Sequence, residues 1–174
     1  MPGNNSVPQI ADLNRDGLPD LLIGVKNGRL RYFPNIGSPG NPQFETDLFS
    51  APNNFAFGDI DAAGAGDLIG NATPLLIDRN DHFSMLLATS SLGLKYYEFS
   101  KNDLDEDFHP FIEDLGEIRV GYFLYPAVED LNDDGFLELV MGSRRGGLTI
   151  FETNLGVTAN EEIERSFDAT VFPN

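Results

Sequence analysis

The sequence predicts an all-β fold, and three observations lead to this prediction. Short apolar runs that end in a small residue, such as 21–24 and 139–142, are typical of buried strands. Tight-turn pairs follow these runs, as at Asn27 with Gly28 and at Gly146 with Gly147. The same order of features occurs three times along the chain, which indicates three similar β units.

Each unit contains a Pro, an acidic loop, an apolar strand, a tight turn and an aromatic strand. The units begin at Pro8, Pro74 and Pro126, so their starts are 66 and 52 residues apart. Such periods are typical of repeat architectures, in which each unit buries its faces against its neighbours. We expect the units to occupy residues 1–56, 57–110 and 111–156, followed by a linker or tail at 157–174.

Every unit is expected to place two strands around its tight turn. The turns fall at 26–28, 90–93 and 144–147, and Asn-Gly and Gly-Gly pairs there are strong hairpin signals. The predicted strands, paired within each unit, are residues 21–24 with 30–33, 85–87 with 94–97, and 139–142 with 148–151.

One acidic loop with the pattern D-x-N-x-D-G-x-x-[D/E] occurs twice, at 12–20 and 130–138. Side-chain oxygens at loop positions 1, 3, 5 and 9 and the backbone carbonyl of position 7 can converge on one cation, while Gly at position 6 permits the sharp turn. Ca²⁺ accepts about 6–8 such oxygens with loose geometry. The predicted calcium ligands are Asp12, Asn14, Asp16, Leu18 and Asp20 in the first loop and Asp130, Asn132, Asp134, Phe136 and Glu138 in the second.

These loops differ from EF-hands. An EF-hand needs a Glu at position 12 and flanking helices, whereas position 12 is Ile23 in the first loop and Met141 in the second, and both loops lead into strands. A solvated turn rich in Asp and Asn, without metal, is the alternative interpretation.

Two other acidic segments are expected to be metal-free. The middle loop, 78–84, lacks Gly at position 6 and is two residues shorter, although Asp78, Asn80 and Asp81 retain oxygen side chains. The cluster 59–67 has Ala at position 5. The segment 57–61, which overlaps the start of this cluster, aligns roughly with 115–119 of the last unit. We therefore predict an outer strand or a connection there, and two calcium sites in total.

The bulk composition excludes several functional classes. The 174 residues suffice for one domain with a core, and the net charge of −17 argues against nucleic acid as a partner. The absence of Cys excludes disulfides and thiolate metal sites. No apolar run approaches the roughly 20 residues of a transmembrane segment. The first residues lack the features of a signal peptide, so we expect either a removed signal or a fragment of a longer chain.

The three units resemble FG-GAP/VCBS repeats, the repeats that also form the blades of the integrin alpha-chain β-propeller. The resemblance covers nearly all of residues 8–155, and only the middle loop departs from it. It is carried by Pro8, Asp12, Asn14, Asp16, Gly17, Asp20, Gly24, Gly28 and Tyr32, and by Pro126, Asp130, Asn132, Asp134, Gly135, Glu138, Gly142 and Gly147.

Membership of this family would imply four-stranded antiparallel blades, with Ca²⁺ in the loop that joins two strands, and a role in binding or adhesion outside the cell. Propellers have about 4–8 blades. About three blades would therefore make an incomplete propeller or a fragment, whose open end blades allow self-association. The ending Val171-Phe172-Pro173-Asn174 also resembles the start of a type IX secretion sorting domain of Bacteroidetes, which would imply export; an ordinary polar tail is the alternative.

No catalytic motif is evident in the sequence. His82 and His109 do not form H-E-x-x-H, and neither a G-x-S-x-G elbow nor a phosphate-binding Gly-rich loop is present. The predicted function is a secreted or cell-surface, calcium-binding, non-enzymatic module that recognises a protein or a glycan. The alternative is the propeller portion of a secreted polysaccharide-degrading enzyme. Within the aromatic run 121–125, Tyr122 and Tyr125 are the expected exposed pair.

Overall fold

A computed structural model describes residues 5–47, 49, 55–63, 69–90, 93–118, 121–156 and, as backbone, 168–172. The described residues form strands and two short 3-10 turns, which confirms the all-β prediction. The strands are β1 (Val7–Ala11), β2 (Asp20–Gly24), β3 (Leu30–Phe33), β4 (Thr73–Asp78), β5 (Phe83–Ala88), β6 (Leu94–Phe99), β7 (Tyr125–Glu129), β8 (Glu138–Gly142), β9 (Leu148–Glu152) and β10 (Asp168–Phe172). Within the described ranges, no helix is long and apolar enough to cross a membrane.

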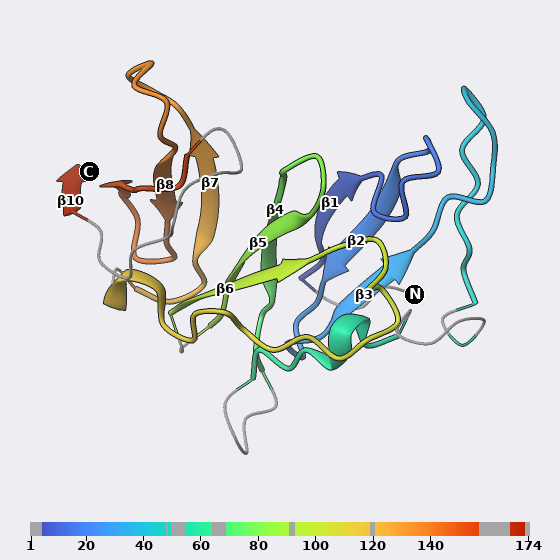
Figure 1. Ribbon diagram of the computed structural model, residues 1–174. Helices are drawn as coiled ribbons and strands as arrows, with labels where there is room; N and C mark the ends of the chain where they lie inside the picture. The colour runs from blue at the N-terminus through green and yellow to red at the C-terminus, as the bar shows by residue number, and fades with distance from the viewer. Residues whose placement is uncertain are drawn as a thin grey trace.

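The strands form three antiparallel sheets, ordered β1-β2-β3, β4-β5-β6 and β10-β9-β8-β7 (Figure 1). The first two sheets have three strands within the described residues, instead of the expected four. After β6, the next segment pairs with it only through the bridge between Tyr96 and Ile112. The third sheet gains its fourth strand from β10, which lies in the region expected to be a tail. No closed propeller is formed by the described residues.

The three sheets share the same register. Pro8, Pro74 and Pro126 are each the second residue of the first strand, opposite Ile23, Leu87 and Met141 respectively. In all three sheets this strand lies at the sheet edge, where a residue without a backbone N–H is tolerated. The sequence pattern marks the Pro residues as starts of the units, but it does not predict the strands that contain them.

The central strand of the middle sheet, β5, is buried on both faces and contributes to two cores. All six residues of β5 are buried. Met85 and Leu87 belong to a cluster with Leu22 and other residues of the first sheet. Leu86 belongs to a second cluster with Leu139 and other residues of the third sheet. Successive side chains of a strand point to opposite faces, which explains why one continuous apolar run serves both cores.

The segments expected to be outer strands or connections are 3-10 turns, η1 (Phe57–Asp59) and η2 (Leu115–Glu117). An outer strand is wrong for 57–59 because φ is 65° at Gly58 and 47° at Asp59, values that a strand does not adopt. In η2 the values are almost the same, 66° at Gly116 and 48° at Glu117. The two segments are therefore equivalent turns that connect successive sheets.

Candidate metal centre

The two predicted calcium loops occupy equivalent places in the first and third sheets. Each loop joins the first strand of its sheet to the second, β1 to β2 and β7 to β8. The residue at loop position 9 is the first residue of the second strand, and it pairs with the last residue of the first strand. These pairs are Ala11 with Asp20 and Glu129 with Glu138. The sheets thus fix both ends of each loop.

In the first loop, oxygens at positions 1, 3 and 5 accept hydrogen bonds from the loop backbone. The Asp16 N–H donates to Asp12 Oδ1 and to Asn14 Oδ1, both at 3.0 Å. The Gly17 N–H donates to Asp12 Oδ2 at 2.8 Å, and the Leu18 N–H donates to Asp16 Oδ1 at 2.8 Å. These bonds hold the side chains of positions 1, 3 and 5 against a single turn of the loop.

The second loop has the same hydrogen bonds. The Asp134 N–H donates to Asp130 Oδ1 at 3.2 Å and to Asn132 Oδ1 at 2.9 Å, and the Gly135 N–H donates to Asp130 Oδ2 at 3.0 Å. The Phe136 N–H donates to Asp134 Oδ1 at 2.8 Å. Although positions 4, 7, 8 and 9 differ between the loops, both sequences adopt one conformation.

The backbone angles of the two loops also agree. At position 4, φ is 59° in Arg15 and 61° in Asp133, and at position 6 it is 90° in Gly17 and 92° in Gly135. Nothing lies within 4 Å of a Cβ placed on either Gly, so the requirement for Gly is conformational and not steric. A side chain at these values of φ would strain the turn.

The residues present fit a hard cation by their chemistry, because each loop offers two carboxylates and one amide oxygen around an exposed turn. A carboxylate has about four lone-pair sites, so an oxygen that accepts one backbone N–H can still ligate a metal. Among the described residues, no group of three or more His, Cys, Asp or Glu side chains is placed to hold a metal ion. Any ion in these loops would therefore depend on the Asn side chain and on backbone carbonyls as well.

Position 9 has a different environment from the other ligand positions. Asp20 is fully buried. Its Oδ2 accepts hydrogen bonds from the Tyr32 hydroxyl at 2.9 Å and the Leu13 N–H at 3.1 Å, and its Oδ1 accepts one from the Asn35 N–H at 2.7 Å. Burial raises the pKa of Asp20, while these hydrogen bonds oppose the rise. Asp20 thus ties the loop to the sheet, and its role as a ligand stays a prediction.

Glu138 also binds the loop backbone. It is 5% exposed and accepts a hydrogen bond from the Leu131 N–H at 2.7 Å. Ile150 occupies the place in the third sheet that Tyr32 occupies in the first, opposite the third residue of the second strand. Ile150 carries no hydroxyl that could donate to Glu138. Asn132 Nδ2 also donates to Glu138 Oε1, at 3.5 Å.

Two residues that support the loops were missed from the sequence. Asn35 donates through Nδ2 to the carbonyl of Pro19, at loop position 8, at 3.0 Å. In the last unit, Thr153 Oγ1 donates to the equivalent carbonyl, that of Leu137. Both residues lie 16 positions after the carbonyl that they bind. This shared offset is the signal that would have identified them.

In the middle unit, an arginine stands opposite the first acid of the loop. Arg15, at position 4 of the first calcium loop, donates from Nη1 and Nη2 to both carboxylate oxygens of Asp78, each at 2.6 Å. Its guanidinium also lies 4.2 Å from the centre of the Phe83 ring. The hydrogen bond from Arg15 lowers the pKa of Asp78. Asp81 pairs instead with His82, with 2.7 Å between Oδ1 and Nδ1.

The acidic residues at the end of η1 and just after it are paired with a base as well. Arg29 Nη1 lies 2.9 Å from Asp59 Oδ1, and Arg29 Nη2 lies 3.3 Å from Asp61 Oδ2. The structure therefore brings together the side-chain oxygens of positions 1, 3 and 5 in two loops. It pairs Asp59, Asp61 and Asp78 with arginines and Asp81 with His82.

No protein-family model, no curated protein and no solved structure matches this chain.

Proposed function

We propose that this protein is a calcium-stabilised module of β repeats that acts outside the cell and recognises a protein or a glycan. The observation that carries the proposal is the agreement between loops 12–20 and 130–138 in hydrogen bonds and in backbone angles. Two loops 118 residues apart in the sequence adopt one conformation that gathers side-chain oxygens on an exposed turn. The lack of any catalytic motif favours recognition over catalysis.

In each loop, the side chains of positions 1, 3 and 5 and the carbonyl of position 7 would hold the ion. A bound ion would offset part of the net charge of −17 and fix the link between the first two strands of the sheet. An ion that binds only the folded state adds RT ln(1 + [L]/Kd) to stability, about 2.7 kcal/mol per site at a hundredfold excess over Kd.

The proposed architecture is part of a β-propeller of the FG-GAP/VCBS type. The first strands of the three sheets support it, because β1 contacts β4 and β4 contacts β7. Successive first strands are expected to lie side by side around a propeller axis. Ile10 on β1 is 72% exposed, so this end of the array offers apolar surface for another blade or another copy of the chain.

Thermal unfolding in EDTA, in millimolar Ca²⁺ and in millimolar Mg²⁺ tests the metal assignment, with calorimetry for the stoichiometry. We expect two calcium sites and a calcium-specific rise in Tm of about 10–20 °C when Ca²⁺ exceeds Kd a hundredfold. Asp16→Asn and Asp134→Asn should each remove one site, whereas Asp81→Asn in the middle loop should remove none. A Tm that is the same in EDTA and in Ca²⁺ would reduce both loops to metal-free turns.

Recognition is tested separately with a glycan array and by the release of new chain ends from polysaccharides. Binding without release of products supports a recognition module. Turnover of any polysaccharide would instead assign the chain to an enzyme.

A further inference from the structure

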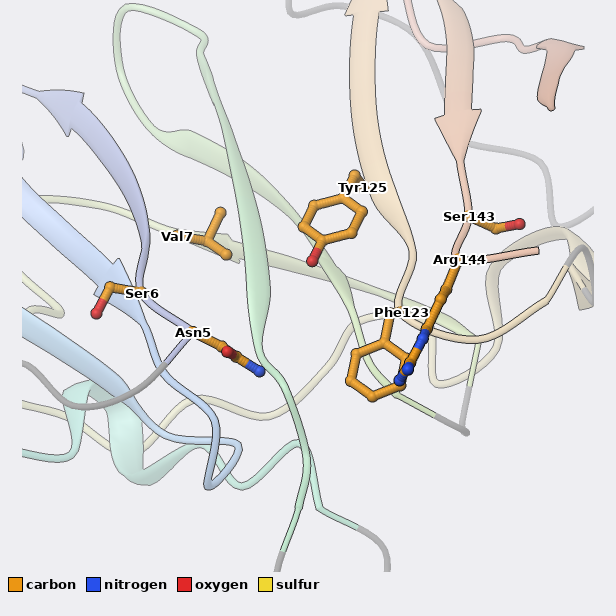
Figure 2. A pocket seen from close by; sticks show the side chains of 7 residues that line it. All are labelled: Asn5, Ser6, Val7, Phe123, Tyr125, Ser143 and Arg144. Carbon is orange, nitrogen blue, oxygen red and sulfur yellow. The ribbon is translucent and has the colours of Figure 1, made fainter. Parts of the chain in front are cut away.

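A pocket with a volume of about 410 Å³ lies between the start of β1 and the end of the third sheet where β7 begins and β8 ends (Figure 2). Phe123, Tyr125 and Arg144 gather on one side of it, and Asn5 and Ser6 lie on the other (Figure 2). Among the residues that the structure describes, the lining consists of Asn5, Ser6, Val7, Phe123, Tyr125, Ser143 and Arg144.

The pocket is at the opposite end of the sheets from the acidic loops. The pocket residues lie just before or at the start of β1 and β7, and just after the end of β8. The acidic loops follow the far ends of β1 and β7. Five residues of strand, at about 3.3 Å each, separate the two ends by about 16 Å, which exceeds the Debye length of about 8–10 Å at physiological salt. The carboxylates of the loops therefore weaken an anion site here only slightly.

Arg144 gives the pocket a positive charge. The Arg144 N–H donates to the carbonyl of Tyr122 at 3.0 Å, and its guanidinium lies 5.2 Å from the centre of the Phe123 ring. Its neighbour Arg145 lies 5.4 Å from the Tyr122 ring and does not line the pocket. Neither arginine belongs to an ion pair among the residues that the structure describes, although the chain has 28 acids and 11 bases. The Arg144 side chain is therefore open to an external anion.

Aromatic side chains form the wall beside Arg144. Tyr125 is 53% exposed, as expected from the sequence, and its ring borders the pocket. Phe123 has a φ of 54°, which is uncommon for a bulky residue and which directs its ring beside the guanidinium. On the opposite wall, the Asn5 amide donates to Asn71 Oδ1 at 3.1 Å, which holds this polar side chain in place.

We propose that this pocket binds a uronic acid residue of an acidic glycan. A planar guanidinium binds a carboxylate through two parallel hydrogen bonds, the aromatic rings suit the apolar face of a pyranose, and amide and hydroxyl groups suit its hydroxyls. The inference rests on the proposed recognition function and names the class of ligand. A negatively charged chain that keeps an arginine beside an exposed tyrosine and a partly buried phenylalanine is suited to select a carboxylated sugar over a neutral one.

The test is calorimetric titration of the whole chain, in Ca²⁺, with tetrasaccharides that contain glucuronate, galacturonate or mannuronate. Their carboxyl-reduced forms and a sulfated neutral tetrasaccharide serve as comparisons. At least one uronate should bind, and its reduced form should bind at least about tenfold more weakly. Arg144→Gln should raise Kd about tenfold to a hundredfold, as expected for charge-assisted hydrogen bonds. Arg145→Gln, which makes the same change in charge one residue away, should change Kd less than about twofold.

The inference is overturned if none of the three uronates binds, if the reduced or sulfated sugars bind as well as the uronates, or if the two arginine variants weaken binding equally. Tyr125→Leu, which keeps an apolar residue on β7, supplies a second variant, and it should also weaken binding. The Tm of every variant in Ca²⁺ verifies folding. A calcium-dependent Tm without uronate binding would refute this inference alone, whereas uronate binding without any calcium effect would refute only the calcium assignment.

Discussion

Replacement of Arg15 by Gln should destabilise the middle loop, which lies 63 residues further along the chain. The change removes the two hydrogen bonds to Asp78 and the contact with the Phe83 ring. Arg15 has a φ of 59°, and Gln in its place carries a similar backbone cost, so the effect reports the lost interactions. Asp133→Gln, at the same loop position with a φ of 61°, is the matched control.

The expected size follows from the exposure of the pair. The side chains of Arg15 and Asp78 are 25% and 50% exposed, so solvent weakens their attraction. Exposed pairs contribute about 0.2–1 kcal/mol, and bidentate geometry places this pair in the upper half of that range. The cation–π contact adds about 0.5–1 kcal/mol. Arg15→Gln should therefore lower the free energy of unfolding by about 1–2 kcal/mol, or lower Tm by about 2–8 °C.

Urea unfolding of a double-mutant cycle is the assay. Arg15→Gln, Asp78→Asn and the double variant are compared in Ca²⁺, and the coupling free energy between the two residues should be about 0.5–1 kcal/mol. The control Asp133→Gln should change stability by less than about 0.5 kcal/mol. A coupling near zero would refute the reasoning, because the middle loop would then gain nothing from the guanidinium.

Three further predictions concern single groups. Tyr32→Phe should cost about 1–3 kcal/mol in urea unfolding, because the buried Asp20 loses a hydrogen-bond donor; an unchanged midpoint would contradict that contact. The pKa of Asp78 lies below the ordinary value of 3.8, so the pair of Asp78 with Arg15 stabilises the fold above about pH 4 and is lost as pH falls through the lowered pKa. The difference in the free energy of unfolding between wild type and Asp78→Asn should therefore shrink as pH falls. A difference that stays constant with pH would contradict this prediction. Leu86→Ala should cost about 2–5 kcal/mol, whereas a cost below about 1 kcal/mol would argue against the second core.

Local patterns were sufficient to predict six of the strands. The apolar runs became β2, β5 and β8 and the aromatic runs became β3, β6 and β9, because each strand lies beside its partner across a short turn or loop. The first strands were not predicted, since a Pro at their second position opposes a strand assignment when the edge position is not known. Thr170, Val171 and Phe172 favour a strand, but their sequence does not indicate that the strand pairs with β9.

The candidate site was predicted in a similar way. The conformation of the loops depends on residues within nine positions of one another, so the spacing of acids, Asn and Gly was informative. The hydrogen bonds of Tyr32 and Asn35 with Asp20 and the pair of Arg15 with Asp78 come from other strands and other units. The contacts of Asp20 depend on how β3 and the segment after it lie beside β2, and the pair of Arg15 with Asp78 depends on how two sheets pack. The spacing of residues within a loop encodes neither arrangement.

The burial of β5 on both faces has a consequence for how the molecule unfolds. Because neighbouring side chains of this single strand complete two different cores, neither core can open without loss of packing in the other. The three sheets should therefore melt in one cooperative transition, even though each resembles a separate unit in the sequence. A change at either acidic loop would then alter the stability of the whole chain, and the middle sheet is the element that transmits it.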